Sequence, residues 1–216
     1  MKNNETEFLV TDIKELSGRR RLVVINYEPA FAVYTSELKK FDIYKDNIIS
    51  AGTYNTLLTE VLNKRAAARA MNLLKSRDYA RQELIDRLSK DYYPESSVSY
   101  ALDYVEHYGY INDYRYAQNY LQFKGTAKSQ KQITVYLHKK GIAPDIIEQV
   151  CDEYYGQSED VQLNLIVGQM RKKTSQIQDF SYENKIKLMA YFYRKGFEAD
   201  TIKKALDIVV DESDGY

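Results

Sequence analysis

A set of five large apolar positions recurs three times along this chain with the same internal spacing. The copies begin 49 and then 55 residues apart, so each unit has room for three short helices rather than a helical hairpin. The positions are Leu84, Leu88, Tyr93, Val98 and Leu102; Ile133, Leu137, Ile142, Ile147 and Cys151; and Leu188, Phe192, Phe197, Ile202 and Leu206. The pattern predicts a mainly α-helical chain of three tandem three-helix repeats that form an elongated, curved array.

The segment before the repeats has a different character. Residues 22–27 and 31–34 are rich in Val, Ile and Tyr, and Glu28 with Pro29 between them are turn residues, so this stretch predicts a β-hairpin. Residues 8–13 are a candidate third strand. We therefore expect a small β-rich module in front of the helical repeats.

Helical signals follow this module. Ser36 is the expected N-cap of a short helix that carries Glu37 in its first turn. Apolar residues at three- and four-residue intervals predict a long helix over residues 55–74. The predicted domains are a β-rich module at 1–54 and repeats at 55–111, 112–156 and 157–216, the last with an acidic tail.

Breaks between the predicted helices fall at equivalent places in the repeats. Gly141 and Gly196 share one offset, at which glycine most easily adopts the left-handed conformation that closes a helix. The first repeat has Tyr92 there, and we expect Pro94 to end that helix by holding the preceding residue extended. Ser129 with Gln132 predicts a capping box at the start of the middle helix of the second repeat.

Composition narrows the class of protein. No apolar run approaches the roughly 20 residues that span a bilayer, and residues 1–7 are polar, which favours a cytoplasmic protein. The single cysteine, Cys151, takes a position where the other repeats have Leu, so we expect it to be buried rather than reactive. His107 and His138 lie on different repeats without acidic or thiol residues at metal-ligand spacing, so no metal or cofactor is expected.

The charge is unevenly distributed although the formal net charge is zero. Residues 114–144 contain no Asp or Glu but six Lys or Arg residues, interleaved with tyrosines. Beyond Phe197 the balance reverses and acidic residues dominate. A charge run of this kind is typical either of solvated helix faces or of a contact surface for an anionic partner.

Three sequence motifs carry a resemblance to a known family. They read Arg-Asp-Tyr-Ala-Arg-Gln-Glu-Leu at 77–84, Tyr-Gly-Tyr-Ile-Asn-Asp-Tyr-Arg-Tyr-Ala at 108–117 and Leu-His-Lys-Lys-Gly-Ile at 137–142. With Tyr-Arg-Lys-Gly-Phe at 193–197 and a β-rich extension in front, the whole chain resembles the RecX family of recombination regulators. It departs from the family at Ala80, where a small hydroxyl residue is expected before the first middle helix.

The resemblance implies a negative regulator of the RecA recombinase. Proteins similar to this one bind the RecA filament on single-stranded DNA along its groove and suppress ATP hydrolysis, strand exchange and coprotease activity, which places them in DNA repair and the SOS response. The implied partners are the RecA filament and, as part of it, single-stranded DNA; no membrane is implied, and we expect a monomer. No catalytic residue is expected, because the sequence contains no phosphate-binding glycine loop and no nucleophile beside a general base.

Two sets of cationic residues are candidates for the contact with RecA or its DNA. The first set lies in the acid-free segment and comprises Arg115, Lys124, Lys128, Lys131, Lys139 and Lys140. The second lies in the first repeat and comprises Arg69, Arg77, Arg81 and Arg87. Arg81 and Arg87 have acidic neighbours within helical reach and are equally candidates for local ion pairs, whereas Lys128 and Lys131 have none.

Two other function classes stay open at this point. Three-helix units resemble helix-turn-helix domains, so the chain is alternatively a DNA-binding module that acts by occupying DNA directly. The zero net charge predicts weak binding of such a module to bare DNA at physiological salt. An enzyme is the third class, for which the sequence offers no acid-base or nucleophile pair.

Overall fold

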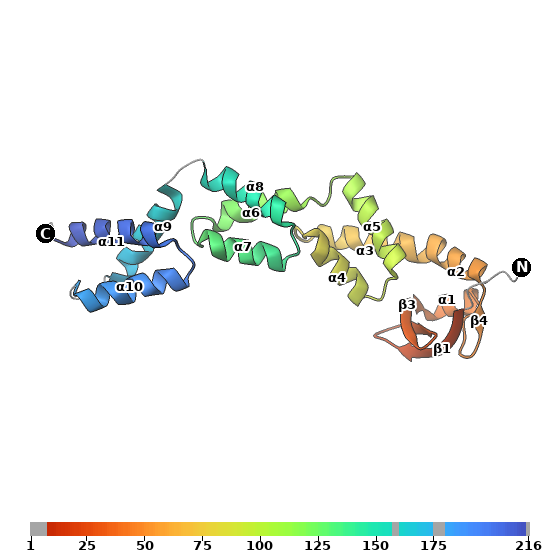
Figure 1. Ribbon diagram of the computed structural model, residues 1–216. Coiled ribbons are helices and arrows are strands. Elements are labelled where there is room, and N and C mark those ends of the chain that lie inside the picture. The colour runs from red at the N-terminus through yellow and green to blue at the C-terminus, as the bar shows by residue number, and fades with distance from the viewer. Residues whose placement is uncertain (1–7, 157–159, 175–179, 215–216) are drawn as a thin grey trace, which may run out of the picture. The chain divides into compact units, whose positions relative to one another are not determined.

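The computed structural model describes residues 8–156, 160–174 and 180–214 (Figure 1). The chain divides into two compact units, and the boundary in the sequence lies between Asn112 and Asp113. Within these ranges the chain is mostly helical, with a small antiparallel sheet at its start. The predicted fold class, a mainly α-helical repeat protein behind a β-rich module, is confirmed.

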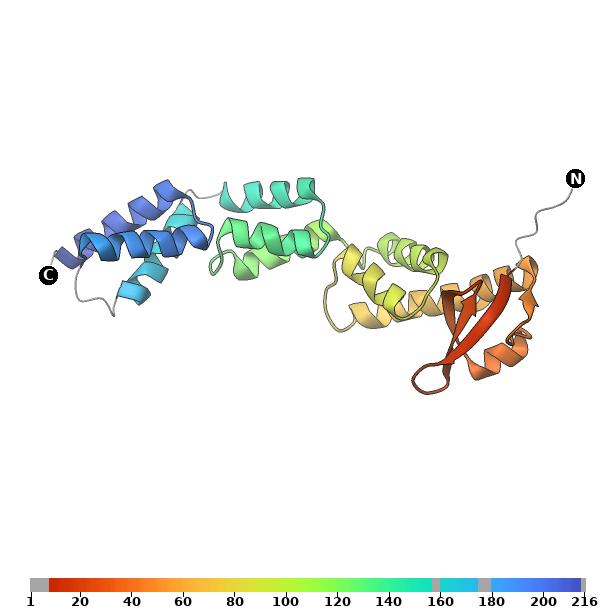
Figure 2. The same ribbon diagram turned by 60° about the horizontal axis from the view of Figure 1, so that its bottom comes forward.

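The first unit opens with a four-stranded antiparallel sheet of order β3-β2-β1-β4 (Figure 2). Its elements are β1 (Phe8–Glu15), β2 (Arg20–Ile25), β3 (Glu28–Tyr34), α1 (Thr35–Lys40) and β4 (Ile48–Ile49). The short strand β4 was not predicted, because two residues are too few for an alternating pattern to be recognised.

The hairpin between β2 and β3 turns two residues earlier than predicted. Asn26 and Tyr27 have φ values of 49° and 70°, as a two-residue hairpin turn requires at both positions. The prediction of a turn at Glu28 and Pro29 is therefore wrong. Pro29 lies instead within β3, an edge strand in which its missing N–H is tolerated.

The helix after β3 also begins earlier than expected. The helix α1 starts at Thr35, so Ser36 is not its N-cap; Tyr34 takes that place, and its N–H donates to the Glu37 carboxylate over 2.7 Å. Glu37 lies in the first turn, as predicted.

One continuous helical stretch joins the sheet to the first repeat. It consists of α2 (Ala51–Leu57), a π-helical segment η1 (Leu58–Leu62) and α3 (Asn63–Leu74). It starts four residues before the predicted helix because Ser50 caps it, accepting a hydrogen bond from the Thr53 N–H over 3.1 Å. The predicted domain limit between residues 54 and 55 falls inside this stretch.

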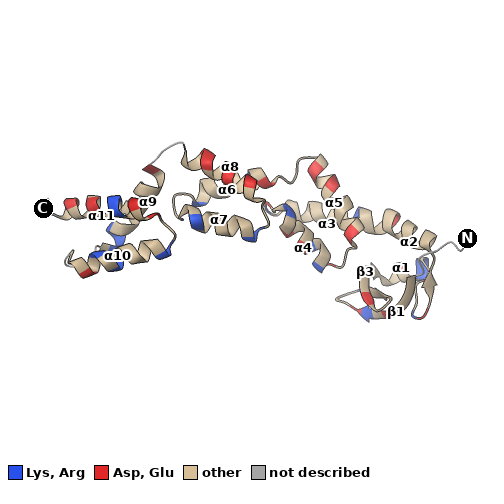
Figure 3. Cartoon of the chain, in the orientation of Figure 1, with Lys and Arg blue, Asp and Glu red and all other residues tan. Residues whose placement is uncertain are grey.

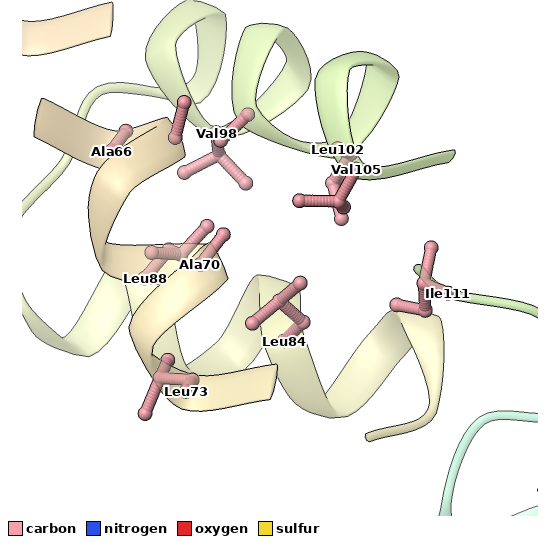
Figure 4. Packing of buried hydrophobic residues seen from close by; sticks show 11 residues of the cluster. Ala66, Ala70, Leu73, Leu84, Leu88, Val98, Leu102, Val105 and Ile111 are labelled. Carbon is pink, nitrogen blue, oxygen red and sulfur yellow. The ribbon is translucent and has the colours of Figure 1, made fainter. Parts of the chain in front are cut away.

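The two halves of this stretch belong to different hydrophobic cores. Leu57 and Leu62 pack with the sheet, whereas Ala66, Ala70 and Leu73 pack with the first repeat. The repeat is completed by α4 (Arg81–Lys90) and α5 (Glu95–His107), and Figure 4 shows side chains of the three helices meeting in its core. The helix therefore joins the β-rich module to the first repeat through shared burial rather than through a linker.

The second unit contains two further groups of three helices. The first group is α6 (Asp113–Lys124), α7 (Gln130–Lys139) and α8 (Pro144–Tyr155), and the second is α9 (Asp160–Thr174), α10 (Tyr182–Arg194) and α11 (Ala199–Asp214). Of the fifteen repeated apolar positions, all but the half-buried Tyr93 are buried. The apolar pattern therefore marks the cores of the repeats, as predicted.

All three middle helices close with the same backbone geometry. Tyr92, Gly141 and Gly196 have φ values of 63°, 78° and 87°. After each of them the next residue donates its N–H back to the carbonyl five residues earlier, as in Phe197 to Phe192 over 3.3 Å. Tyr92 thus adopts the left-handed conformation of its glycine equivalents, and the expectation that Pro94 ends this helix by a different route is wrong.

The turn that closes a middle helix also contacts the module that precedes it within the same unit. In the first unit the Asp91 carbonyl accepts a hydrogen bond from the Arg20 guanidinium of β2 over 2.6 Å. In the second unit the equivalent Lys195 carbonyl accepts from the Ser129 hydroxyl over 2.7 Å. In both units, therefore, the carbonyl two residues before the equivalent positions Tyr93 and Phe197 anchors the helix end to the preceding module.

Candidate functional site

A groove lined by cationic side chains lies between the two repeats of the second unit. Its volume is about 410 Å³, and α6, the loop before α7, α7 and the end of α10 form its walls. The charged residues that line it are Lys128, Lys131, Lys139, Arg194 and Lys195. No carboxylate is among its lining residues, so this basic groove suits an anionic partner.

The start of α7 forms part of one wall of the basic groove. Ser129 and Gln132 form the predicted capping box: the Ser129 hydroxyl accepts from the Gln132 N–H, and the Gln132 side chain accepts from the Ser129 N–H, both over 3.2 Å. Ser129 is fully buried and its hydroxyl also donates to the Lys195 carbonyl. A cap that was predicted for one helix therefore also ties the two repeats together.

Gly196 allows the other wall to approach closely. A β-carbon at this position would lie 2.8 Å from Cβ of Lys131, and the backbone has a left-handed φ of 87°. Cβ of Lys131 is fixed to the backbone of α7 and cannot rotate away. Both features require glycine, so the distance between the two walls depends on it.

Substitution of Gly196 by alanine is expected to destabilise the second unit by about 2–3 kcal/mol, because left-handed strain and the contact with Lys131 act together. Gly109→Ala is the matched control, since Gly109 has a φ of 66° but open space at the β-carbon position. It is expected to cost only about 1 kcal/mol. Native-state hydrogen exchange measures the two local free energies of opening, and equal losses would contradict the close packing at Gly196.

Two stacked tyrosines form the aromatic part of the groove. The rings of Tyr120 and Tyr136 are parallel within 7° and 4.1 Å apart between centroids. Burial raises the pKa of the Tyr120 phenol, which stays neutral at physiological pH. Nζ of Lys140 lies 5.5 Å from the Tyr136 ring centroid. The stacked pair offers a flat surface beside cations, an arrangement that suits nucleobases as well as protein side chains.

Lys195 is positioned by the last repeat. Its Nζ donates to Oε1 of Gln169 over 3.0 Å and lies 4.7 Å from the Tyr191 ring centroid. A hydrogen bond from Lys195 lowers the pKa of the Tyr191 phenol, and the charges of Lys195 and Lys173 add to the effect. The end of α10 therefore carries a concentration of positive charge, which Figure 3 shows in blue together with that of α7.

The structure brings only part of the first predicted set together. Lys128, Lys131 and Lys139 line the basic groove, and Lys140 is adjacent through Tyr136. Arg115 and Lys124 are exposed on α6, outside the residues that line it.

Sequence reasoning missed Arg194 and Lys195, which complete the groove. The signal was present, because both belong to the Tyr-Arg-Lys-Gly-Phe motif at 193–197. In the sequence that motif contributed to the family resemblance and marked a helix end, and its two cations were not included among the candidate contact residues.

The second predicted set is largely engaged in ion pairs of the first unit. Arg69 pairs with Asp91, Arg77 with Glu83 and Arg81 with Glu106, at N···O distances of 2.7–2.8 Å. Arg87 is exposed, beside Asp86 and Lys90. Three of the four arginines thus have ion-pair partners, and Arg81 pairs with a carboxylate of α5 rather than with an acidic neighbour on its own helix.

The described residues offer few other candidates for a reactive side chain or a metal site. Cys151 is buried, as predicted, and burial raises the pKa of its thiol. Within residues 8–156, 160–174 and 180–214, no three His, Cys, Asp or Glu side chains gather as a metal site would require. In the same ranges no helix is long and apolar enough to cross a membrane.

Comparisons with known proteins agree with this architecture. Residues 160–206 match a family model described as the third three-helix domain of RecX. The regulatory protein RecX of Legionella pneumophila is 31% identical over 140 residues, which cover 62% of this chain and 88% of that protein. The chain belongs to the RecX family.

Further relatives extend the match over more than nine tenths of the chain. The regulatory protein RecX of Caldanaerobacter subterraneus subsp. tengcongensis is 27% identical over 198 residues, 91% of this chain and 96% of that protein. A crystal structure of regulatory protein RecX shares the fold with a TM-score of 0.64 at 20% identity, covering 93% of this chain and 99% of that one. RecX from Lactobacillus salivarius has a TM-score of 0.63 at 25% identity, over 68% of this chain and 96% of that one. RecX proteins form a regulatory family, and this chain has a RecX regulatory role.

Proposed function

We propose that this chain is a negative regulator of the RecA recombinase. In this proposal it binds the RecA filament on single-stranded DNA along the filament groove. Binding suppresses ATP hydrolysis, strand exchange and coprotease activity. The chain acts in the cytoplasm as a monomer and performs no chemistry itself.

The basic groove is the observation that carries this proposal. Five Lys or Arg side chains and a stacked tyrosine pair line one cavity without a carboxylate among them. A RecA filament on single-stranded DNA offers phosphates, bases and protein carboxylates, and each of these finds a complementary group in the groove. Membership of the RecX family supports the same partner.

The contact residues in this proposal are those of the groove and its margin. Lys128, Lys131 and Lys139 make the central contacts together with Arg194 and Lys195. Lys140 supports them beside Tyr136, while Arg115 and Lys124 extend the positive surface along α6. In the second set, Arg87 is the one arginine without an ion pair among the described residues, so it is the remaining candidate there.

The decisive experiment is the single-stranded-DNA-dependent ATPase rate of the cognate RecA as this protein is titrated in. Binding to the same DNA without RecA is measured in parallel at the same salt concentration. We expect the rate to fall at protein concentrations too low to coat bare DNA. An unchanged rate over the whole titration would reject the proposal.

A second candidate function is direct occupation of DNA by a helix-turn-helix-like module. The acid-free lining of the basic groove favours it, because phosphates alone suffice as partners. Tight binding to bare DNA together with an unchanged ATPase rate would establish this alternative. The slope of the DNA-binding constant against salt concentration, on logarithmic scales, would then give the number of phosphates contacted.

A further inference from the structure

The outer face of α5 carries a row of exposed tyrosines. Tyr100, Tyr104 and Tyr108 follow one another at intervals of one helical turn, and their exposed fractions are 44%, 39% and 56%. Tyr110, just beyond the helix, is 48% exposed. The opposite face of α5 supplies Val98, among others, to the core of the first repeat, so these tyrosines are not needed to fill that core.

The tyrosine rings form a contiguous surface. The centroids of Tyr104 and Tyr108 are 4.9 Å apart, and those of Tyr108 and Tyr110 are 6.0 Å apart. His107 stands edge-on to Tyr108 at 5.0 Å. Exposed aromatic side chains that touch one another in this way are typical of binding surfaces.

The charge carried by α5 and its flanking residues is opposite in sign to that of the basic groove. Residues 91–114 contain no Lys or Arg but five carboxylates, those of Asp91, Glu95, Asp103, Glu106 and Asp113. Asp103 and Glu106 are exposed on α5 among the tyrosines, and Figure 3 shows acidic residues on this helix. Arg81 of α4 pairs with Glu106 and neutralises part of this charge, whereas Asp103 has no ion pair among the residues described.

Carboxylates beside aromatic faces select against phosphates and in favour of cations. The chain itself shows the favoured contact, because the Arg77 guanidinium carbon lies 3.7 Å from the Tyr79 ring centroid, with Glu83 paired to the same arginine. In the described part of the chain no Lys or Arg covers Tyr104 or Tyr108 in this way. These two rings are therefore available to a cation from outside.

We propose that Tyr100, Asp103, Tyr104 and Tyr108 form a docking surface for an arginine- or lysine-bearing segment of a partner protein. The cationic side chains of the segment stack on the tyrosine rings and pair with Asp103. This surface shares no residue with the basic groove and goes beyond the proposed function, on which it does not depend.

The test uses the full-length chain and a fluorescein-labelled peptide of alternating glycine and arginine, eight residues long, as a probe. Fluorescence anisotropy measures its Kd. The double variant Tyr104→Leu with Tyr108→Leu keeps apolar area but removes the negative ring faces, and Asp103→Lys reverses the charge. We expect each variant to weaken binding about tenfold, a value in the range of one lost cation-π or charge contact.

Matched variants separate the surface from general electrostatics. Asp207→Lys makes the same charge change on the exposed face of α11 and is expected to leave the Kd within about twofold. Tyr104→Phe with Tyr108→Phe keeps the ring faces and is expected to retain binding. Equal losses for Asp207→Lys and Asp103→Lys, or full binding by the leucine variant, would overturn the proposal.

A parallel titration with DNA distinguishes a protein-docking role of the tyrosine surface from a DNA-binding role. A labelled oligothymidylate of the same charge magnitude is titrated against the same variants and against Lys131→Glu. We expect Lys131→Glu to reduce DNA binding and to spare peptide binding, and the leucine variant to do the reverse. A leucine variant that loses DNA binding and keeps peptide binding would assign the tyrosines to nucleic acid and reject the protein partner.

Discussion

Replacing Lys128, Lys131 and Lys139 together by glutamate is expected to raise the concentration that halves the RecA ATPase rate by about 100-fold. The three side chains line one groove, so a single anionic partner loses three contacts and gains three repulsions. Contacts of about 1 kcal/mol each give about 3 kcal/mol, or roughly 100-fold in Kd. The ATPase titration of wild type and variant in parallel checks this value.

The matched control for this variant reverses three exposed lysines elsewhere. Lys45, Lys203 and Lys204 are all exposed and lie outside the groove, so their replacement by glutamate makes the same change in net charge. We expect inhibition to change less than about threefold, because salt screens exposed charges that do not contact the partner. Equal losses in both variants would mean that net charge rather than the groove determines binding.

Phe192→Ala is expected to destabilise the last repeat by about 3–5 kcal/mol, the range for a large aromatic side chain removed from a packed core. Phe192 is fully buried in α10, and its ring centroid lies 5.9 Å from that of Phe197 in the loop between α10 and α11. Phe123→Ala removes the same side chain from a position that is 79% exposed and is expected to change stability by less than about 0.5 kcal/mol.

Urea unfolding, monitored by circular dichroism, measures the free energy of unfolding of both phenylalanine variants. Hydrogen exchange then locates the loss, which should concentrate in residues 182–206. Because Arg194 and Lys195 follow Phe192 on the same helix end and line the groove, Phe192→Ala should also weaken RecA inhibition. A similar loss of stability in both variants would contradict the burial that separates them.

Much of the helical architecture was predictable because it depends on local spacing. The repeated apolar positions become the repeat cores, and the closing residues Gly141 and Gly196 take the left-handed conformation that their offset implied. Capping by Ser129 was predictable for the same reason, since Ser and Gln three residues apart satisfy the backbone at a helix start. The prediction of the hairpin turn was wrong because Asn26 and Tyr27 were assigned to the strand, whereas Glu28 and Pro29 looked like stronger turn residues.

The candidate site was only partly predictable. The acid-free segment at 114–144 identified Lys128, Lys131 and Lys139, because all three come from one stretch of sequence. Arg194 and Lys195 come from the next repeat and reach the same groove only because Ser129 and Gly196 bring the two repeats into contact. Conversely, Arg69 was a candidate contact residue in the sequence but pairs with Asp91 at the end of α4. Arg81 does form an ion pair, but with Glu106 of α5 rather than with a neighbour on its own helix.

The sequence by itself determined the number and order of the repeats, their cores and the family, because apolar spacing, helix caps and motifs are local properties of the chain. Tertiary structure alone decided which charges are paired and which remain for a partner. That choice depends on distances between residues far apart in sequence, such as the 66 positions that separate Ser129 from Lys195. Packing between repeats, which one copy of the pattern does not encode, produced the basic groove, whereas packing within the first repeat left the tyrosine face of α5 outside its core.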